Sequence, residues 1–336
     1  MKIKYFIVLS LLISFFAYGK VVTTLERISK PQMISVSENY FLITEGSTIF
    51  IYSMKDLSFV RKFGKAGEGP KEFKVSPFGP PMIANFYHGN IFVSSNSKVS
   101  YFTPDGKFIK EFRVAPFSLF RPFKNVFVAT GSAVNDDKQT VLTINLHNSK
   151  LEKVKELYKS DMSIGPNSSF SYPMNQFSYE PYGDKLYLVR GKEGFVIDVI
   201  SISGDKLYTI KKEYEKIKVT QEYKDKTFQS FKTNPNFKQF FEYFKQRTKF
   251  KKFYPPIQDI RVTDDRIYVI TFKKKNSNTE CIILDLKGNE LKRVYVPYPE
   301  LHGLDYLPEY DIFNKTFYIL IENEDEEVWE LHSMGL

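Results

Sequence analysis

A short apolar cluster with an aromatic residue in second place recurs six times along this chain of 336 residues. These clusters are rich in β-branched and aromatic side chains, which is typical of buried β-strands. Most copies follow turn formers such as Gly89-Asn90 and Asp264-Asp265. The copies occupy residues 40–43, 91–94, 126–129, 186–189, 267–270 and 317–320. This repetition predicts that the chain uses one small strand-based unit six times.

The residues around each cluster repeat as well. After the fourth cluster, a strand pattern at 195–203 leads through Gly204-Asp205 to another at 206–213. Such dipeptides form hairpin turns because Gly and Asn tolerate positive φ. A first strand is expected before each cluster, as at 257–263. Each unit is therefore four antiparallel strands, and the radial closure of such units is the β-propeller solution to exposed sheet edges, so we predict an all-β, six-bladed β-propeller.

The two ends of the chain are expected to close this ring together. The sixth unit has strand patterns near 304–310, at 316–321 and at 327–333, and the chain then ends at residue 336. Its missing fourth strand is predicted to be residues 21–28, from the beginning of the chain. This pairing would join the ring through both ends of the chain and remove an open sheet edge. The propeller is thus expected to span residues 20–336 as one domain.

The first 19 residues have the pattern of a secretory signal peptide. Lys2 and Lys4 precede a short apolar run at 5–16, and Ala17-Tyr18-Gly19 places small residues where a signal peptidase cleaves. We therefore expect residues 1–19 to be removed and the protein to be periplasmic or secreted. An uncleaved anchor is the alternative, although the run is shorter than the roughly 20 residues that span a bilayer. No transmembrane segment is expected in the mature chain.

The composition of the chain excludes several classes of protein. Hydrophobic residues make up 42% of the chain and charged residues 26%, which argues against both disorder and a membrane protein. The formal net charge is +9, and the lysines look scattered along the chain, so we expect a solvated surface and no nucleic-acid partner. Cys281 is the only cysteine, so no internal disulfide is expected. Its alternating apolar surroundings predict a buried strand residue.

Residues 63–73 read FGKAGEGPKEF, which resembles the connector of NHL repeats. The resemblance continues through Gly89-Asn90-Ile91-Phe92-Val93 to Pro104-Asp105-Gly106-Lys107, and it is specific over about two blades. It implies a six-bladed propeller like those of many exported bacterial proteins. A phosphate-binding loop is the other interpretation of the glycines. The stretch lacks the Gly-Lys-Ser/Thr of such loops, which favours the connector.

One connection between blades is much longer than the others. The strand pattern disappears at about 216–254, and Asn234-Pro235 is a good helix start. Four phenylalanines then follow at helical spacing and predict one aromatic face: Phe237, Phe240, Phe241 and Phe244. A second helix is less strongly indicated at 221–231. This insertion is interpreted either as a cap docked on the propeller or as a lid or partner-binding helix. The basic residues at 245–252 suit an anionic partner, a lipid surface or a solvated helix end.

Propellers usually bind ligands on one face. That face is formed by the loops from the second to the third strand of each blade and by the connections between blades. The insertion belongs to it because it joins the fourth and fifth blades. Polar residues expected to converge there, at the mouth of the central channel, are Glu45, Asn96, Arg121, Arg190, Gln258, Asp259 and His302. Each comes from a first strand, an inter-strand loop or the edge of a blade.

The indications of an enzyme are few. His88, His147, His302 and His332 have no close metal-ligand spacing. NHL-like lyases and related lactonases bind a metal through side chains from several blades, but no complete ligand set is matched here. We therefore assign no catalytic residue and no cofactor, and a divalent metal at the channel mouth stays open.

Three functional hypotheses follow. The first is an exported binding propeller that engages a protein, peptide or glycan through the face with the insertion. The alternative is a metal-assisted hydrolase or lyase at the channel mouth, which would need about three converging ligand side chains. The third is a scaffold whose inserted helix docks on a membrane surface.

Overall fold

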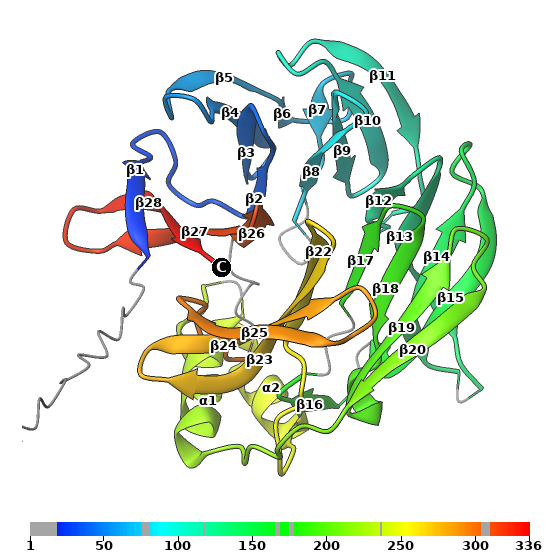
Figure 1. Cartoon of the computed structure of the whole chain (residues 1–336), viewed down its shortest axis with the longest axis vertical. Helices are drawn as coiled ribbons and strands as arrows, with labels where there is room; N and C mark the ends of the chain where they lie inside the picture. The colour runs from blue at the N-terminus through cyan, green and yellow to red at the C-terminus, as the bar shows by residue number, and fades with distance from the viewer. Residues whose placement is uncertain are drawn as a thin grey trace, which may run out of the picture.

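Six antiparallel sheets of four strands surround a central axis in the computed structural model (Figure 1). The structure describes residues 19–75, 81–116, 118–136, 138–164, 169–174, 178–235, 237–303 and 310–336. Within these residues each sheet is one blade, and its strands follow one another from the axis outward. The fold is the six-bladed β-propeller that the repeats predict.

The blades share one order of strands, with the apolar cluster always in the second strand. Blades 1 and 2 are β2 (Met33–Val36), β3 (Tyr40–Glu45), β4 (Thr48–Ser53) and β5 (Phe59–Phe63), then β8 (Ile83–Tyr87), β9 (Asn90–Ser95), β10 (Lys98–Phe102) and β11 (Phe108–Arg113). Blades 3 and 4 are β12 (Phe120–Phe123), β13 (Val126–Val134), β14 (Thr140–His147) and β15 (Lys153–Ile164), then β17 (Tyr179–Tyr182), β18 (Lys185–Val189), β19 (Phe195–Ser201) and β20 (Lys206–Lys212). Blades 5 and 6 are β22 (Asp259–Thr263), β23 (Arg266–Lys275), β24 (Asn278–Asp285) and β25 (Glu290–Val296), then β26 (Tyr310–Phe313), β27 (Thr316–Asn323), β28 (Val328–Gly335) and β1 (Lys20–Thr24).

The hydrophobic cores of the ring lie between neighbouring blades. Val189 and Ile197 of blade 4, for example, share a cluster with Ile260 and Val269 of blade 5. Equivalent clusters join the other pairs of adjacent blades, including blade 6 to blade 1. Burying one such side chain contributes roughly 1.5–3 kcal/mol, so these clusters stabilise the ring. The repeated apolar cluster is the sequence signature of this packing.

The first strand of the chain closes the ring. β1 pairs antiparallel with β28, from Lys20 opposite Ser333 to Thr24 opposite Glu330. The Trp329 indole N–H then donates to the Ser29 carbonyl over 3.0 Å, which holds the chain just beyond the strand. The closure predicted from the sequence is therefore confirmed. The first strand of blade 6 begins at Tyr310, at the end of the range predicted for it, and residues 304–309 lie outside the described part.

The glycine-rich stretch is folded as a connector between blades 1 and 2. Its strands β6 (Lys65–Ala66) and β7 (Glu72–Phe73) pair in parallel. The buried Lys98 ammonium donates to the carbonyl oxygens of Glu68 and Gly69 over 2.6 and 2.8 Å. Gly64 has a φ of 91°, and a Cβ there would lie 2.5 Å from the Ser47 carbonyl oxygen, so a side chain does not fit. Carbonyl oxygens thus converge on a cation, which is the opposite of a phosphate-binding loop.

The insertion between blades 4 and 5 forms helices at both predicted places, although the longer one is where the weaker signal lay. The longer helix is α1 (Gln221–Thr233), capped by Thr220, whose hydroxyl accepts from the Tyr223 N–H over 3.1 Å. It is followed by η2 (Lys238–Phe240), α2 (Phe241–Arg247) and β21 (Thr248–Phe250). Asn234 ends α1, because its N–H donates to the Ser230 carbonyl while its ψ of 118° leaves the helical range. Asn234 thus ends α1, and its carbonyl also accepts from the Lys238 N–H over 2.9 Å at the entry to the second helical segment.

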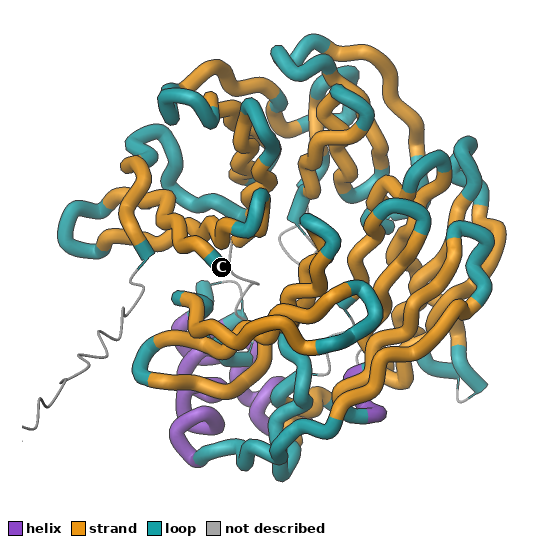
Figure 2. The backbone as a smooth tube through the Cα atoms, in the orientation of Figure 1, coloured by secondary structure: helices purple, strands orange, loops and turns teal. Residues whose placement is uncertain are grey.

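The predicted aromatic face is largely buried. Phe244 is buried, and Phe237 and Phe241 are half-buried against the same aromatic cluster. Phe240 is 45% exposed because it lies in η2, where the helical spacing is broken. Figure 2 shows α1 and α2 gathered at one side of the ring, beside blade 5. The Tyr254 ring stacks on Phe272 of β23 at 4.8 Å, which ties this subdomain to that blade.

Candidate functional site

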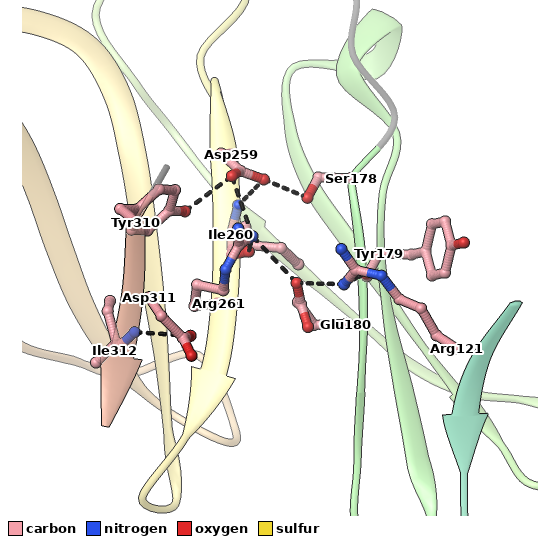
Figure 3. A network of polar contacts seen from close by, with 10 residues as sticks. All are labelled: Arg121, Ser178, Tyr179, Glu180, Asp259, Ile260, Arg261, Tyr310, Asp311 and Ile312. Carbon is pink, nitrogen blue, oxygen red and sulfur yellow. Dashed lines mark hydrogen bonds and ion pairs between the residues drawn. The ribbon is translucent and has the colours of Figure 1, made fainter. Parts of the chain in front are cut away.

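The innermost strands bring charged side chains to the central channel. Arg121, Glu180, Arg261 and Asp311 come from β12, β17, β22 and β26, and each is half-buried next to buried neighbours in its strand. Side chains alternate along a strand, so these four face the axis while their neighbours pack between blades. Figure 3 shows them across the space between these four strands. Around the axis, the two arginines alternate with the two carboxylates.

Glu180 is shared by the two arginines. Its Oε1 lies 2.7 Å from Arg121 Nη1 and 3.1 Å from Arg261 Nη1 (Figure 3). Arg261 Nη1 also lies 3.1 Å from Asp259 Oδ2 in its own strand. The pairs therefore connect the innermost strands of the neighbouring blades 3, 4 and 5. Charge-assisted hydrogen bonds of this kind are stronger than neutral ones, and burial keeps water from competing for them.

Asp259 is the second centre of the network. Its carboxylate accepts from the Tyr310 hydroxyl over 2.8 Å, the Ser178 hydroxyl over 2.5 Å and the Ile260 N–H over 2.9 Å (Figure 3). These donors belong to blades 6, 4 and 5. The side chain is 3% exposed, so its charge is compensated by these donors and by Arg261.

Asp311 continues the ring of contacts to blade 1. Its Oδ2 accepts from the Val36 N–H of β2, and its Oδ1 from the Ile312 N–H, both over 2.8 Å. Burial raises the pKa of this carboxyl to about 6, against the opposing influence of Arg261 and of the two backbone donors. These contacts therefore compensate the charge of Asp311 only in part.

The arginines are held firmly in their charged form. Burial opposes the charge of Arg261, but Tyr310, Asp259 and Glu180 raise its pKa well above the usual value. Burial likewise opposes the charge of Arg121, and Glu180 raises its pKa. The Arg261 guanidinium also lies 4.4 Å from the centre of the Tyr310 ring. Such permanently charged groups can hold anions or fix the blades, but they do not transfer protons.

One hydroxyl beside this network lacks a partner. Tyr298 is fully buried and its ring packs edge-on against Tyr310 at 5.2 Å. Its hydroxyl has no hydrogen-bond partner in the described part of the chain, and burial and Asp259 raise its pKa well above the usual value. An unsatisfied buried hydroxyl is costly, which marks this spot as a polar position next to the channel.

The helical insertion is part of a larger subdomain, which we call the cap. It combines three successive connections between blades, and its centre is a cluster of buried aromatic residues. From the connection of blades 3 and 4, β16 (Phe170–Tyr172) pairs in parallel with β21. From the connection of blades 5 and 6, the His302 carbonyl accepts from the Ser230 hydroxyl over 3.1 Å. The cluster contains Tyr172, Tyr223, Phe231 and Phe244.

The cap and one end of the charge network lie on the same face of the ring. Every innermost strand begins where a connection between blades ends, so all six strands start at this face. Asp259 and Tyr310 are the first residues of β22 and β26, and Ser178 directly precedes β17. The face that carries the cap therefore also carries the Asp259 end of the charge network.

The structure brings together only some of the predicted site residues. Arg121 and Asp259 belong to one network, joined through Glu180 and Arg261. Gln258 is buried beside Asp259, and its N–H donates to the Ile270 carbonyl over 2.8 Å.

The other four lie apart from this network. Glu45 accepts from the N–H groups of Ser29 and Lys30, and Asn96 occupies the turn between β9 and β10. Arg190 pairs with Asp198 over 2.8 Å within blade 4. His302 is in the cap, where its Nε2 lies 3.6 Å from Glu300 and its ring packs on Tyr223.

Sequence reasoning missed several members of the network, namely Ser178, Glu180, Arg261, Tyr310 and Asp311. For three of these residues, the position relative to the repeated apolar cluster could have identified them. Glu180, Arg261 and Asp311 pair across the first hairpin of their blades with Tyr187, Tyr268 and Tyr318. Each therefore precedes the aromatic residue of its cluster by the same offset, so aligning the repeats on that aromatic residue would have found these positions.

Two kinds of feature are absent from the residues that the structure describes. No three His, Cys, Asp or Glu side chains in this part of the chain are grouped so that they could hold a metal ion. No described helix is both long and apolar enough to cross a membrane.

No family model and no curated protein matches the chain. Many solved structures are similar to it, of which two are described here. Hydrazine synthase from Kuenenia stuttgartiensis is 14% identical with a TM-score of 0.41, over 90% of this chain and 76% of that one. KlHsv2 with loop 6CD replaced by a Gly-Ser linker is 9% identical with a TM-score of 0.42, over 90% of this chain and 98% of that one. Similarity at this level says nothing about the site, and the resemblance to NHL repeats stays a prediction.

Proposed function

We propose that this protein is an exported binding propeller that engages a protein, peptide or glycan through the face that carries the cap. The observation that carries the proposal is the cap itself. Three connections between blades are packed there into one subdomain with its own aromatic core, beside the entrance to the channel. Long connections between the elements of a rigid scaffold are where binding surfaces usually lie.

The charge network supports a binding role more than a catalytic one. Glu180 and Asp259 are both engaged by arginines, and Asp311 by two backbone N–H groups. Such pairing stiffens the ring and leaves these carboxylates engaged. The metal-assisted alternative remains a hypothesis that a metal titration of the purified protein can test.

Export is compatible with the way the ring closes. β1 begins at Lys20, so cleavage after Gly19 would leave every residue of the closing strand in place. We expect the exported protein to start at Lys20. Mass spectrometry of the protein recovered from the cell envelope or the medium tests this, and a chain that retains Met1 would contradict it.

Binding can be tested with a peptide-display library and a glycan array probed with the purified protein. We expect ligands whose affinity falls about tenfold or more when Phe240, the exposed aromatic residue of the cap, is changed to Ala. The matched control is Leu291→Ala, because Leu291 is 53% exposed on the outermost strand of blade 5. Ligands that are sensitive to Leu291 and not to Phe240, or no ligand at all, would overturn the proposal.

A further inference from the structure

The cap holds nearly all of the chain's excess positive charge. Residues 216–254 contain eleven Lys or Arg and three Asp or Glu, a formal net charge of +8. The whole chain carries +9, of which Lys2 and Lys4 contribute +2. The remainder of the propeller is therefore close to neutral, at −1. The lysines are not scattered evenly, as the sequence had suggested, but concentrated in one subdomain.

Most of these cations are not neutralised by a neighbour. Lys226 pairs with Glu222 over 2.7 Å, and Lys251 donates to the Pro173 carbonyl over 2.7 Å. The other nine make no ion pair with any residue that the structure describes. Unpaired charges of one sign raise the local potential and attract partners of opposite charge.

Aromatic rings hold several of these cations in place. Lys232 of α1 and Lys245 of α2 lie 5.1 and 5.8 Å from the centre of the same Phe241 ring. Their ammonium groups are thus at most about 11 Å apart, which is comparable with the screening length in physiological salt. Lys224 lies over Phe250 and Arg247 over Tyr243 in the same way. Cation–π contacts orient these charges without cancelling them.

The surroundings discriminate between kinds of anionic partner. A bilayer-binding helix needs an apolar face toward the lipid, but α1 and α2 bury theirs in the cap core and leave Phe240 as the exposed large apolar side chain of the described cap. A sugar ring would stack on an open aromatic face, whereas cations cover Phe241, Phe250 and Tyr243. Glu and Asp side chains of a flexible polypeptide can reach these cations. They need neither an exposed apolar helix face nor an open aromatic ring.

We propose that the basic cap binds an acidic polypeptide segment through the cations of α1 and α2, above all Lys232 and Lys245 at the Phe241 ring. This inference rests on the proposed function and specifies its partner. Glu or Asp side chains would pair with the cations from α1 and α2, and Phe240 would contact an apolar residue of the segment. The interaction should weaken as salt increases, because exposed charges are screened.

The test is the binding of fluorescently labelled polyglutamate to the purified protein, measured by anisotropy at low and high salt. We expect Lys232→Glu with Lys245→Glu to raise the Kd at least about tenfold, because two attractions become repulsions. The matched control is Lys62→Glu with Lys110→Glu, which makes the same charge change at lysines that lie over Phe50 and Tyr101 in blades 1 and 2. The control should leave the Kd within about twofold.

Other outcomes are decisive. Equal weakening by both double variants would overturn the inference, because it would mean that only net charge matters. Binding of anionic phospholipid vesicles or a sulfated polysaccharide without binding of polyglutamate would overturn it too. If library ligands depend on Phe240 but not on Lys232 and Lys245, the acidic partner is wrong while the proposed function stands. Unchanged unfolding midpoints must accompany each variant.

Discussion

In the channel, Arg121 and Arg261 both lie within 3.1 Å of Glu180, whereas in the cap Lys232 and Lys245 share one phenylalanine ring and pair with no described carboxylate. The channel thus uses its cations to join blades, and the cap directs its cations outward. The cap is held together by buried aromatic rings instead. The same chemical groups are structural in one region and available to a partner in the other.

The largest expected effect concerns the aromatic core of the cap. Phe231 is completely buried there, so Phe231→Ala should cost about 3–5 kcal/mol of the cap's stability. Because the blades have separate cores, we expect faster hydrogen exchange at 216–254 and unchanged exchange in the blade strands. Phe240→Ala is the control, since that side chain is exposed. Equal loosening of blades and cap would show that the two regions unfold together.

The next effect concerns the paired charges of the channel. Glu180→Ala removes the carboxylate that Arg121 and Arg261 share and leaves both half-buried guanidinium groups without it. We expect a loss of about 3 kcal/mol in the free energy of unfolding, measured by denaturant titration. Glu222→Ala, which breaks the exposed pair with Lys226, should leave the midpoint unchanged. A stable Glu180→Ala protein would contradict a structural role of the network.

The buried carboxyl of Asp311 should make the stability of the protein depend on pH. Its pKa of about 6 is above the unfolded value of about 3.9, so the folded protein holds this proton more tightly than the unfolded chain. Stability from this group is therefore present at low pH and lost as pH rises through 6. Relative to Asp311→Asn, the wild type should lose about 2 kcal/mol between pH 4 and pH 7. Parallel stability curves for the two proteins would refute this.

The smallest effect is expected for the cations of the cap. Lys232→Ala with Lys245→Ala removes two exposed side chains that contact one ring, and each contact is worth about 0.5–1 kcal/mol at most. Thermal unfolding should therefore change little, while polyglutamate binding weakens. A large loss of stability would mean that these lysines are structural, like the arginines of the channel.

The propeller was predictable because the apolar cluster that marks each blade is a local sequence pattern and occurs six times. Phe92, Tyr187 and Tyr268 stand at the same place in their blades and are all fully buried, so one pattern indicates six blades and their order. The closing strand followed from counting strands in the last unit. The helix boundaries were harder to predict from the sequence. Asn234 suits a helix start as well as a helix end, and tertiary contacts decide between the two.

The site was only partly predictable, because it depends on contacts between distant strands. Arg121 and Asp259 were chosen for their places in first strands, but Glu180, which lies between their blades, was not. Arg190 is an error of the other kind, a residue that was predicted but does not belong to the network. It is on the expected face, but it pairs with Asp198 in its own blade. Pairing of this kind depends on side-chain direction, which a single sequence does not reveal.

The pairing of β1 with β28 has a consequence for folding during synthesis. β1 is the first strand of the propeller to be synthesised, yet its partner residues lie about 310 positions later. During synthesis the growing protein is an open arc with an unpaired strand at its leading end. Only the synthesis of β28, in the sixth blade, allows that arc to close into a ring.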